Sequence, residues 1–196
     1  MRTRPARDRP AAASRPTNPA PRWRRWWLSR GPVIGYATRF GALLGAGYGV
    51  LLVPCVDRGF YAYLCANAWV SSALLNACGQ PTHAVGLEIR AGQFGIAVRR
   101  GCDAVEPSWF LCAAVLAFPA PWRRKLVGML AGVALISVLN LARIVSLYFV
   151  GRYWPRVFAV AHLELWPAAF IIVTVLFWLG WLYWARGVGV PEHGSA

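Results

Sequence analysis

The chain has 196 residues, enough for one domain, and 58% of them are hydrophobic. That apolar content excludes most soluble domains of this size. The net charge of +14 would indicate nucleic-acid binding in a soluble protein, but the arginines concentrate before the first apolar run, as a membrane protein explains better.

Residues 1–30 hold nine arginines among prolines and alanines, and they predict a disordered basic cytoplasmic tail. The apolar run 33–53 is long enough to cross a bilayer and too long for the core of a cleaved signal peptide. Arg39 interrupts this run near its cytoplasmic end, where the side chain can reach the headgroups. We therefore expect a first membrane-spanning helix here, within a membrane-embedded domain over residues 31–186.

The next segment, Phe60–Cys78, is apolar but carries a polar stripe at helical spacing, made of Asn67, Ser71, Ser72 and Asn76. A span here would reverse the three later helices. An amphipathic helix lying on the outer face would leave them unchanged, and we favour it. Residues 87–100 then alternate apolar and polar side chains around Ala91-Gly92, which predicts a β-hairpin.

Three later runs are predicted to span the membrane: Ser108–Ala120 (extended by residues 104–107), Leu126–Val150 and Val160–Ala185. A loop of Arg123, Arg124 and Lys125 joins the first two, and Arg186 follows the third. With the tail, 13 basic residues fall on one side and six on the other, so both termini are predicted to be cytoplasmic.

The expected fold is therefore an all-α integral membrane protein with about four transmembrane helices. An interfacial amphipathic helix and a short extracytoplasmic β-hairpin complete it. Residues 187–196 are expected to form a flexible C-terminal tail.

Cys102 is predicted to precede the second span on the outer side. Pro107 suits the first helical turn, with Asp103 or Glu106 as a possible cap, and a helix N-terminus favours a thiolate. The other cysteines have no polar partner that the sequence places, so we interpret them as small hydrophobic residues: Cys55, Cys65, Cys78 and Cys112. Because no CxxC pair occurs, we expect no metal site, and we expect no cofactor.

Arg143 is predicted near the outer end of the third span, with Asn140 on the same helical face. An arginine within a span usually has a function or a partner, although snorkelling to the headgroups is the simpler explanation. His162 opens the fourth span, followed by Glu164 and Trp166, and a polar rim would also explain it.

Consecutive spans alternate in direction, which places these candidates at one membrane surface without showing that they touch. Cys102, Arg143 and His162 all fall on the predicted outer surface. Together they would supply a nucleophile, a base and a cation that stabilises an oxyanion.

Four segments in residues 101–185 resemble the exosortase/archaeosortase family, in family order: Gly101–Glu106, Phe118–Arg123, Asn140–Ile144 and His162–Trp166. The Phe-Pro-Ala-Pro-Trp loop is most similar to exosortase H, the form associated with IPTLxxWG-type C-terminal tails. The resemblance implies that Cys102, Arg143 and His162 are the catalytic residues. One departure from the family is Ala104, where glycine is expected.

The resemblance also implies a membrane cysteine protease or transpeptidase of the bacterial inner membrane. Its partners would be secreted proteins that end in a recognition motif, a transmembrane helix and a basic cluster, besides membrane lipids and an acceptor. It would cleave them through a cysteine acyl-enzyme and transfer them, without binding nucleic acid. The charge of Asp103 would either orient His162 as imidazolium or raise the thiol pKa, and both stay open.

Two alternatives come from other classes, a small membrane transporter and a non-catalytic membrane assembly factor. The candidate polar residues gather at one predicted surface. Transport sites usually lie near the bilayer midplane, which argues against the transporter.

Overall fold

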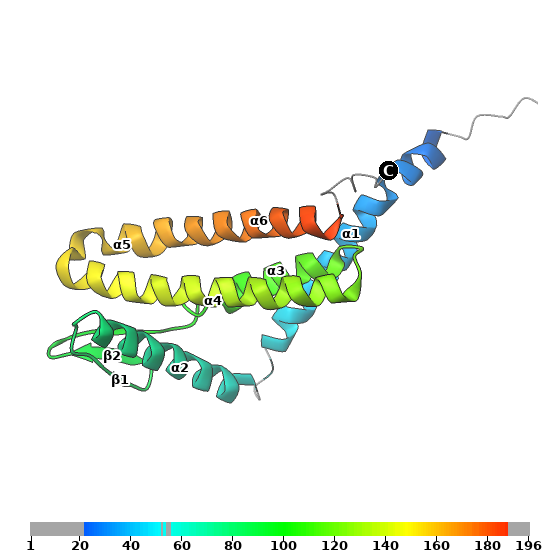
Figure 1. The fold of residues 1–196 in the computed structure, drawn as a ribbon. Helices are drawn as coiled ribbons and strands as arrows, with labels where there is room; N and C mark the ends of the chain where they lie inside the picture. The colour runs from blue at the N-terminus through cyan, green and yellow to red at the C-terminus, as the bar shows by residue number, and fades with distance from the viewer. Residues whose placement is uncertain (1–21, 52, 54–55, 188–196) are drawn as a thin grey trace, which may run out of the picture. The chain divides into compact units, whose positions relative to one another are not determined.

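The computed structural model describes residues 22–51, 53 and 56–187, which are mostly helical (Figure 1). The chain divides into two compact units, Met1–Gly35 and Tyr36–Ala196. Helix α1 (Arg22–Leu51) begins inside the predicted tail, whose residues 1–21 lie outside the described part, as do residues 188–196 of the C-terminal tail. The cores and the candidate site lie in the second unit.

Two long apolar helices of this unit run antiparallel and side by side (Figure 1). One is α4 (Trp122–Tyr153). The other follows a short turn η1 (Pro155–Val157) and joins α5 (Phe158–Val160), η2 (Ala161–Leu165) and α6 (Trp166–Ala185). Both are long and apolar enough to cross a membrane.

The other predicted spans differ from this pair. Helix α3 (Val105–Ala117) is apolar but has only 13 residues. Helix α1 contains most of the predicted run 33–53, yet among the described residues it does not reach the hydropathy of a span. Its several glycines and Arg39 lower the mean hydropathy. Two of the four predicted spans are therefore long and apolar enough to cross a membrane.

Glycines on α4 let its neighbours approach closely. A Cβ added at Gly128 would lie 2.2 Å from Nε1 of Trp181, and one added at Gly132 would lie 2.3 Å from Leu111. Gly128 and Gly132 are four residues apart on one helical face, the small-residue spacing common where membrane helices pack. This face of α4 therefore holds α6 and α3.

The basic residues predicted as a loop, Arg123, Arg124 and Lys125, lie instead in the first turn of α4, and two of them bond the ends of neighbouring helices. Arg124 donates to the carbonyl of Ala185 at 2.6 Å, and Lys125 donates to the carbonyl of Leu116 at 2.7 Å. The last carbonyls of a helix lack partners within the helix and carry partial negative charge. The two cations thus stabilise the C-terminal ends of α6 and α3.

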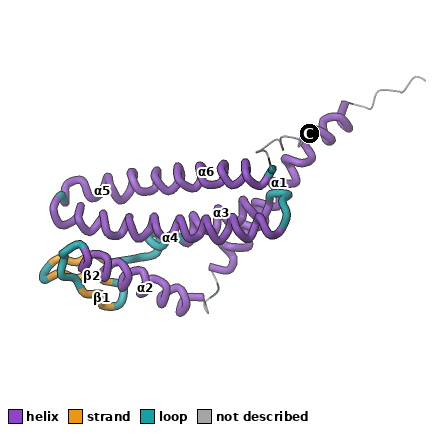
Figure 2. Tube along the Cα trace, viewed as in Figure 1, coloured by secondary structure: helices purple, strands orange, loops and turns teal. Residues whose placement is uncertain are grey.

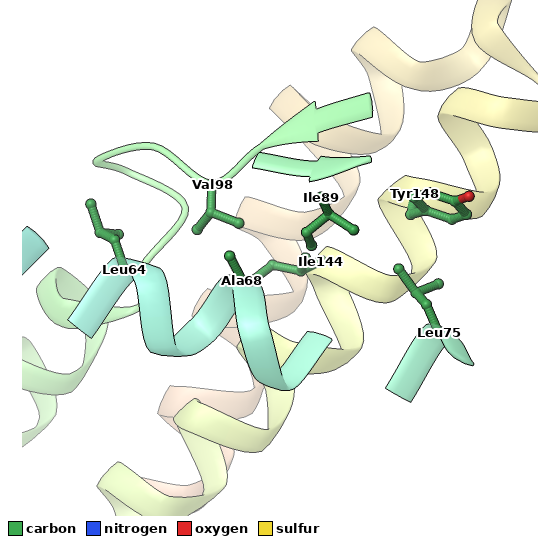
Figure 3. Close-up of a cluster of buried hydrophobic side chains, with 7 residues drawn as sticks. All are labelled: Leu64, Ala68, Leu75, Ile89, Val98, Ile144 and Tyr148. Atoms are coloured by element: carbon green, nitrogen blue, oxygen red, sulfur yellow. The ribbon is translucent and has the colours of Figure 1, made fainter. Parts of the chain in front are cut away.

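Helix α2 (Val56–Ala77) and a small sheet pack against the C-terminal part of α4 (Figure 2). The sheet is antiparallel in the order β1 (His83–Val85), β2 (Glu88–Ala91) and β3 (Phe94–Ala97). Strands β2 and β3 lie within the predicted hairpin segment, whereas β1 was not predicted. Buried apolar side chains join the three parts (Figure 3): Leu64, Ala68, Leu75, Ile89, Val98, Ile144 and Tyr148.

The polar stripe of α2 faces the protein interior. Asn67, Ser71 and Ser72 are buried, whereas Trp69 is 69% exposed. Ser72 and Thr82 share a hydrogen bond of 3.0 Å, and Asn67 accepts one from α4. These three residues therefore face the interior and not water. Asn67 and Ser72 have hydrogen-bond partners there, whereas the hydroxyl of Ser71 has none among the described residues.

Candidate active site

The loop between β3 and α3 carries Cys102 and is closed by its neighbour Asp103. The buried carboxylate of Asp103 accepts hydrogen bonds from the backbone of Gly101 at 3.0 Å and of Val105 at 2.9 Å. Tyr63 on α2 donates to the carbonyl of Asp103 at 2.7 Å. Asp103 thus fixes the backbone on both sides of the thiol, and α2 fixes Asp103.

Ala104 completes this loop in a strained conformation. Its φ is 62° and its ψ is 10°, and among the described residues it is the single non-glycine residue with positive φ. A Cβ atom makes this left-handed region costly, by roughly 1–2 kcal/mol, whereas glycine adopts it freely. The expected family glycine and the observed backbone therefore agree, and alanine at this position carries strain.

The structure brings Cys102 and His162 together from positions sixty residues apart. Sγ of Cys102 lies 3.1 Å from Nε2 of His162. The imidazole stacks on Phe158, with ring centroids 5.7 Å apart and an angle of 11° between the planes. This stacking holds the ring so that one nitrogen meets the sulfur.

His162 sits in the π-helical turn η2, where the helix is locally widened. Pro167 follows at the start of α6. A proline has no N–H, and its ring clashes with the carbonyl four residues earlier, which is Leu163 here. A π-turn removes that clash, and such turns are frequent at functional sites. Pro167 therefore explains the widened turn that carries His162.

Arg143 is buried beside the pair. One guanidinium nitrogen donates to the carbonyl of Gly101 at 3.3 Å, and Cζ lies 5.7 Å from the ring centroid of Phe170. Nε is buried and has no hydrogen-bond partner among the described residues. The guanidinium is thus held against the backbone next to Cys102 while keeping donor capacity.

The surroundings of Cys102 raise its pKa. Burial of the thiol is the largest cause, the positive charge of Arg143 opposes it, and the negative charge of Asp103 adds to it. Of the two roles left open for Asp103, the structure supports the one on the thiol, because both carboxylate oxygens are engaged by backbone N–H groups. The net shift favours the neutral thiol over the thiolate.

The remaining candidates occupy less central positions. Asn140 is buried and donates to Asn67 at 3.3 Å, so its hydrogen bond runs to α2 and not to Arg143 as the shared helical face suggested. Glu106 and Glu164 are exposed and make no hydrogen bond or ion pair with the described residues. Trp166 packs near Phe170, with centroids 6.3 Å apart.

Sequence reasoning missed two contributors on α2. Tyr63 and Asn67 reach the loop of Cys102 and the helix of Arg143, respectively. Asn67 belongs to the polar stripe, so the helical spacing indicated that it lies on a polar face. The spacing did not indicate that Asn140 is its hydrogen-bond partner. Nothing in the sequence around Tyr63 indicated its hydrogen bond.

Arg143 separates two cavities. The smaller one, 50 Å³, is lined by Cys102, His162 and Arg143 among others. The larger one, 650 Å³, lies between α3 and α6 and is lined mainly by apolar side chains, with Arg143 at one end. The thiol–imidazole pair therefore adjoins a space large enough for a ligand.

The described residues thus include two helices long and apolar enough to cross a membrane, and a thiol–imidazole pair beside a buried guanidinium, the side chains that cysteine peptidases use. The sequence model of the family described as Transmembrane exosortase matches residues 31–181. The chain belongs to this family, whose members are generally cysteine peptidases or transpeptidases. No curated protein and no solved structure matches the chain.

Proposed function

We propose that this chain is a membrane cysteine peptidase or transpeptidase that cleaves the C-terminal sorting signals of secreted proteins. The observation that carries the proposal is the distance of 3.1 Å between Sγ of Cys102 and Nε2 of His162, next to the buried Arg143. A thiol becomes an effective nucleophile when a base can take its proton at hydrogen-bond distance.

The reaction runs through a thioester. His162 takes the proton of Cys102, and the sulfur attacks the scissile carbonyl carbon of the substrate. The guanidinium of Arg143 stabilises the negative charge that develops on the carbonyl oxygen. As the tetrahedral intermediate collapses, His162 gives its proton to the leaving amine. Water or an acceptor amine then attacks the thioester, and the thiol is restored.

We also propose how the chain is oriented in the membrane. It has four spans within residues 31–186, with the basic tail and residues 187–196 in the cytoplasm of a bacterium. The site then lies at the outer face of the inner membrane, where the membrane helix of a substrate presents its recognition motif. The substrate type is the IPTLxxWG tail of the exosortase H form.

Mass analysis of a tailed protein from the same genome tests the proposal. Co-expression with the wild-type chain should shorten the protein at its C-terminus, and an added mass would identify an acceptor. The Cys102→Ser variant should leave the tail intact, whereas Cys78→Ser, which changes an exposed free thiol, should process it normally. Unchanged mass with the wild-type chain, or full processing by Cys102→Ser, rejects the peptidase and favours a transporter or an assembly factor.

A further inference from the structure

The large cavity between α3 and α6 has a mostly apolar wall, and its charged and polar lining includes Asp103, Glu106, Arg143 and Thr174. Apolar side chains from both helices line it: Phe110, Pro167, Phe170, Ile171 and Val175. Thr174 also lines it and is 8% exposed, and its hydroxyl has no hydrogen-bond partner among the described residues. A buried hydroxyl without a partner is unfavourable by about 1–3 kcal/mol, so this position favours a ligand that offers a hydrogen bond.

The cavity and the thiol share a boundary. Arg143 lines both this cavity and the small pocket of Cys102 and His162, and Gly101 and Asp103 line the large cavity at the same end. A carbonyl carbon placed at the sulfur, with its oxygen toward Arg143, would therefore have its attached chain at the entrance. Phe110, Ile171 and Val175 are at least partly exposed, so a chain can enter from the side.

The cavity is about as long as an extended peptide of four residues. The lining positions Pro167 and Val175 are eight residues apart on α6, about 12 Å at ~1.5 Å per residue. An extended chain covers that length in roughly four residues.

From these observations we propose that the cavity is the substrate subsite for about three or four apolar residues next to the scissile bond, with Thr174 bonding their backbone. The inference rests on the proposed peptidase function. A lipid chain would also fit the apolar wall, but hydrocarbon offers no hydrogen bond to the hydroxyl of Thr174. A polypeptide offers a donor or an acceptor at every residue.

Covalent probes of Cys102 test the subsite without requiring turnover. Chloroacetyl-Leu-Leu-Leu-amide and acetyl-Leu-Leu-Leu chloromethyl ketone carry the reactive carbon at opposite ends of the peptide. In each reaction the sulfur displaces chloride and the thiol proton leaves. The rate at Cys102 is measured by mass spectrometry and divided by that of the short analogue, chloroacetamide or chloroacetone. N-dodecyl chloroacetamide serves as the hydrocarbon probe.

We expect at least one tripeptide probe to react tenfold or more faster than its short analogue. Ile171→Trp, which fills the cavity, should remove that enhancement. Ile172→Trp is the matched control, because Ile172 is similarly exposed on the same helix and does not line the cavity. Thr174→Val should reduce the enhancement about fivefold, the effect of one hydrogen bond, and Thr174→Ser should keep it.

Three results would overturn the subsite. They are no enhancement with either tripeptide, equal loss in Ile171→Trp and Ile172→Trp, or a dodecyl enhancement that depends on Ile171 while Thr174→Val has no effect on any probe. The last result would identify a lipid site. If the probes behave as expected but no tailed protein is cleaved, the subsite stands and the sorting function fails. If a tailed protein is cleaved but no probe shows an enhancement, the sorting function stands and the subsite fails.

Discussion

Sγ of Cys102 and Nε2 of His162 lie 3.1 Å apart, and a different local structure positions each of the two side chains. The thiol sits in a loop that Asp103 closes, and the imidazole sits in a π-turn next to Pro167. Burial raises the pKa of Cys102, which favours a neutral thiol in the resting pair. In the proposed peptidase, His162 would then take the thiol proton only as a substrate is attacked, unlike the histidine of a preformed thiolate–imidazolium pair.

The raised pKa of Cys102 predicts a slow reaction with iodoacetamide near neutral pH. Only the thiolate reacts, and its fraction falls tenfold for each pH unit below the pKa. The midpoint of the rate against pH should therefore lie above that of the unfolded chain, in a variant whose other cysteines are alanine. Asp103→Asn should lower the midpoint and Arg143→Gln should raise it, because these charges act in opposite directions. A wild-type midpoint below that of the unfolded chain contradicts the neutral resting pair.

Ala104→Gly should change stability little, by less than ~0.5 kcal/mol. Removing the buried methyl group costs about 0.8 kcal/mol, but glycine relieves the strain of a φ of 62°. Ala113→Gly is the control, since Ala113 is buried inside α3 without such strain, and it should destabilise by about 1–2 kcal/mol. Chemical denaturation in detergent measures both, and equal losses would show that position 104 carries no strain.

Pro167→Ala should impair the site by restoring regular helix. Alanine supplies the N–H that can bond the carbonyl of Leu163, so η2 can tighten to an α-helix. Residues before the turn would then rotate relative to α6 by about one helical position, which moves His162 away from Cys102. We expect processing of a tailed protein to fall at least tenfold while the melting temperature stays the same or rises.

Pro155→Ala is the control for that experiment, because a proline in the first turn of a helix makes no backbone bond that alanine would change. It should process normally. Normal processing by Pro167→Ala as well would mean that the widened turn does not position the imidazole.

Gly128→Ala should destabilise the packing of α4 against α6 by about 1–3 kcal/mol. The added Cβ would lie 2.2 Å from Nε1 of Trp181, and that indole is fixed by a hydrogen bond of 3.0 Å to the carbonyl of Arg124. Gly180→Ala meets nothing within 4 Å and should be neutral or slightly stabilising through helix propensity. Thermal unfolding in detergent separates them, and similar melting temperatures would contradict a tight seam at Gly128.

The sequence alone was enough to predict the helical class and the placement of Cys102, Arg143 and His162 at the same end of the helices, but not that their side chains touch. Hydropathy indicated the long helices α4 and α6, and the alternation of spans brings their ends together. An arginine inside a span seldom occurs without a function or a partner, and a cysteine and a histidine fall at the same predicted surface. Hence their positions along the chain carried most of the information about the candidate site.

Other features depend on contacts that no local pattern encodes. The stripe of α2 indicated a polar face, but only packing determines that Asn67 meets Asn140 and that Asn140 does not bond Arg143. Similarly, the sequence gives the identity of Pro167 and Ala104 but not the backbone conformation around them. Their consequences, a π-turn and a left-handed residue, depend on the neighbouring backbone.

The hydrogen bond from Tyr63 to the carbonyl of Asp103 bears on how short a fragment can be and still hold the candidate site together. A fragment restricted to residues 101–185 would keep Cys102, Arg143 and His162 and every motif shared with the family. It would lose α2, and with it the tether of the thiol loop and the partner of Asn140. The part of the chain that holds the candidate site together therefore extends well upstream of these motifs, and truncation would release the thiol loop while leaving the three side chains present.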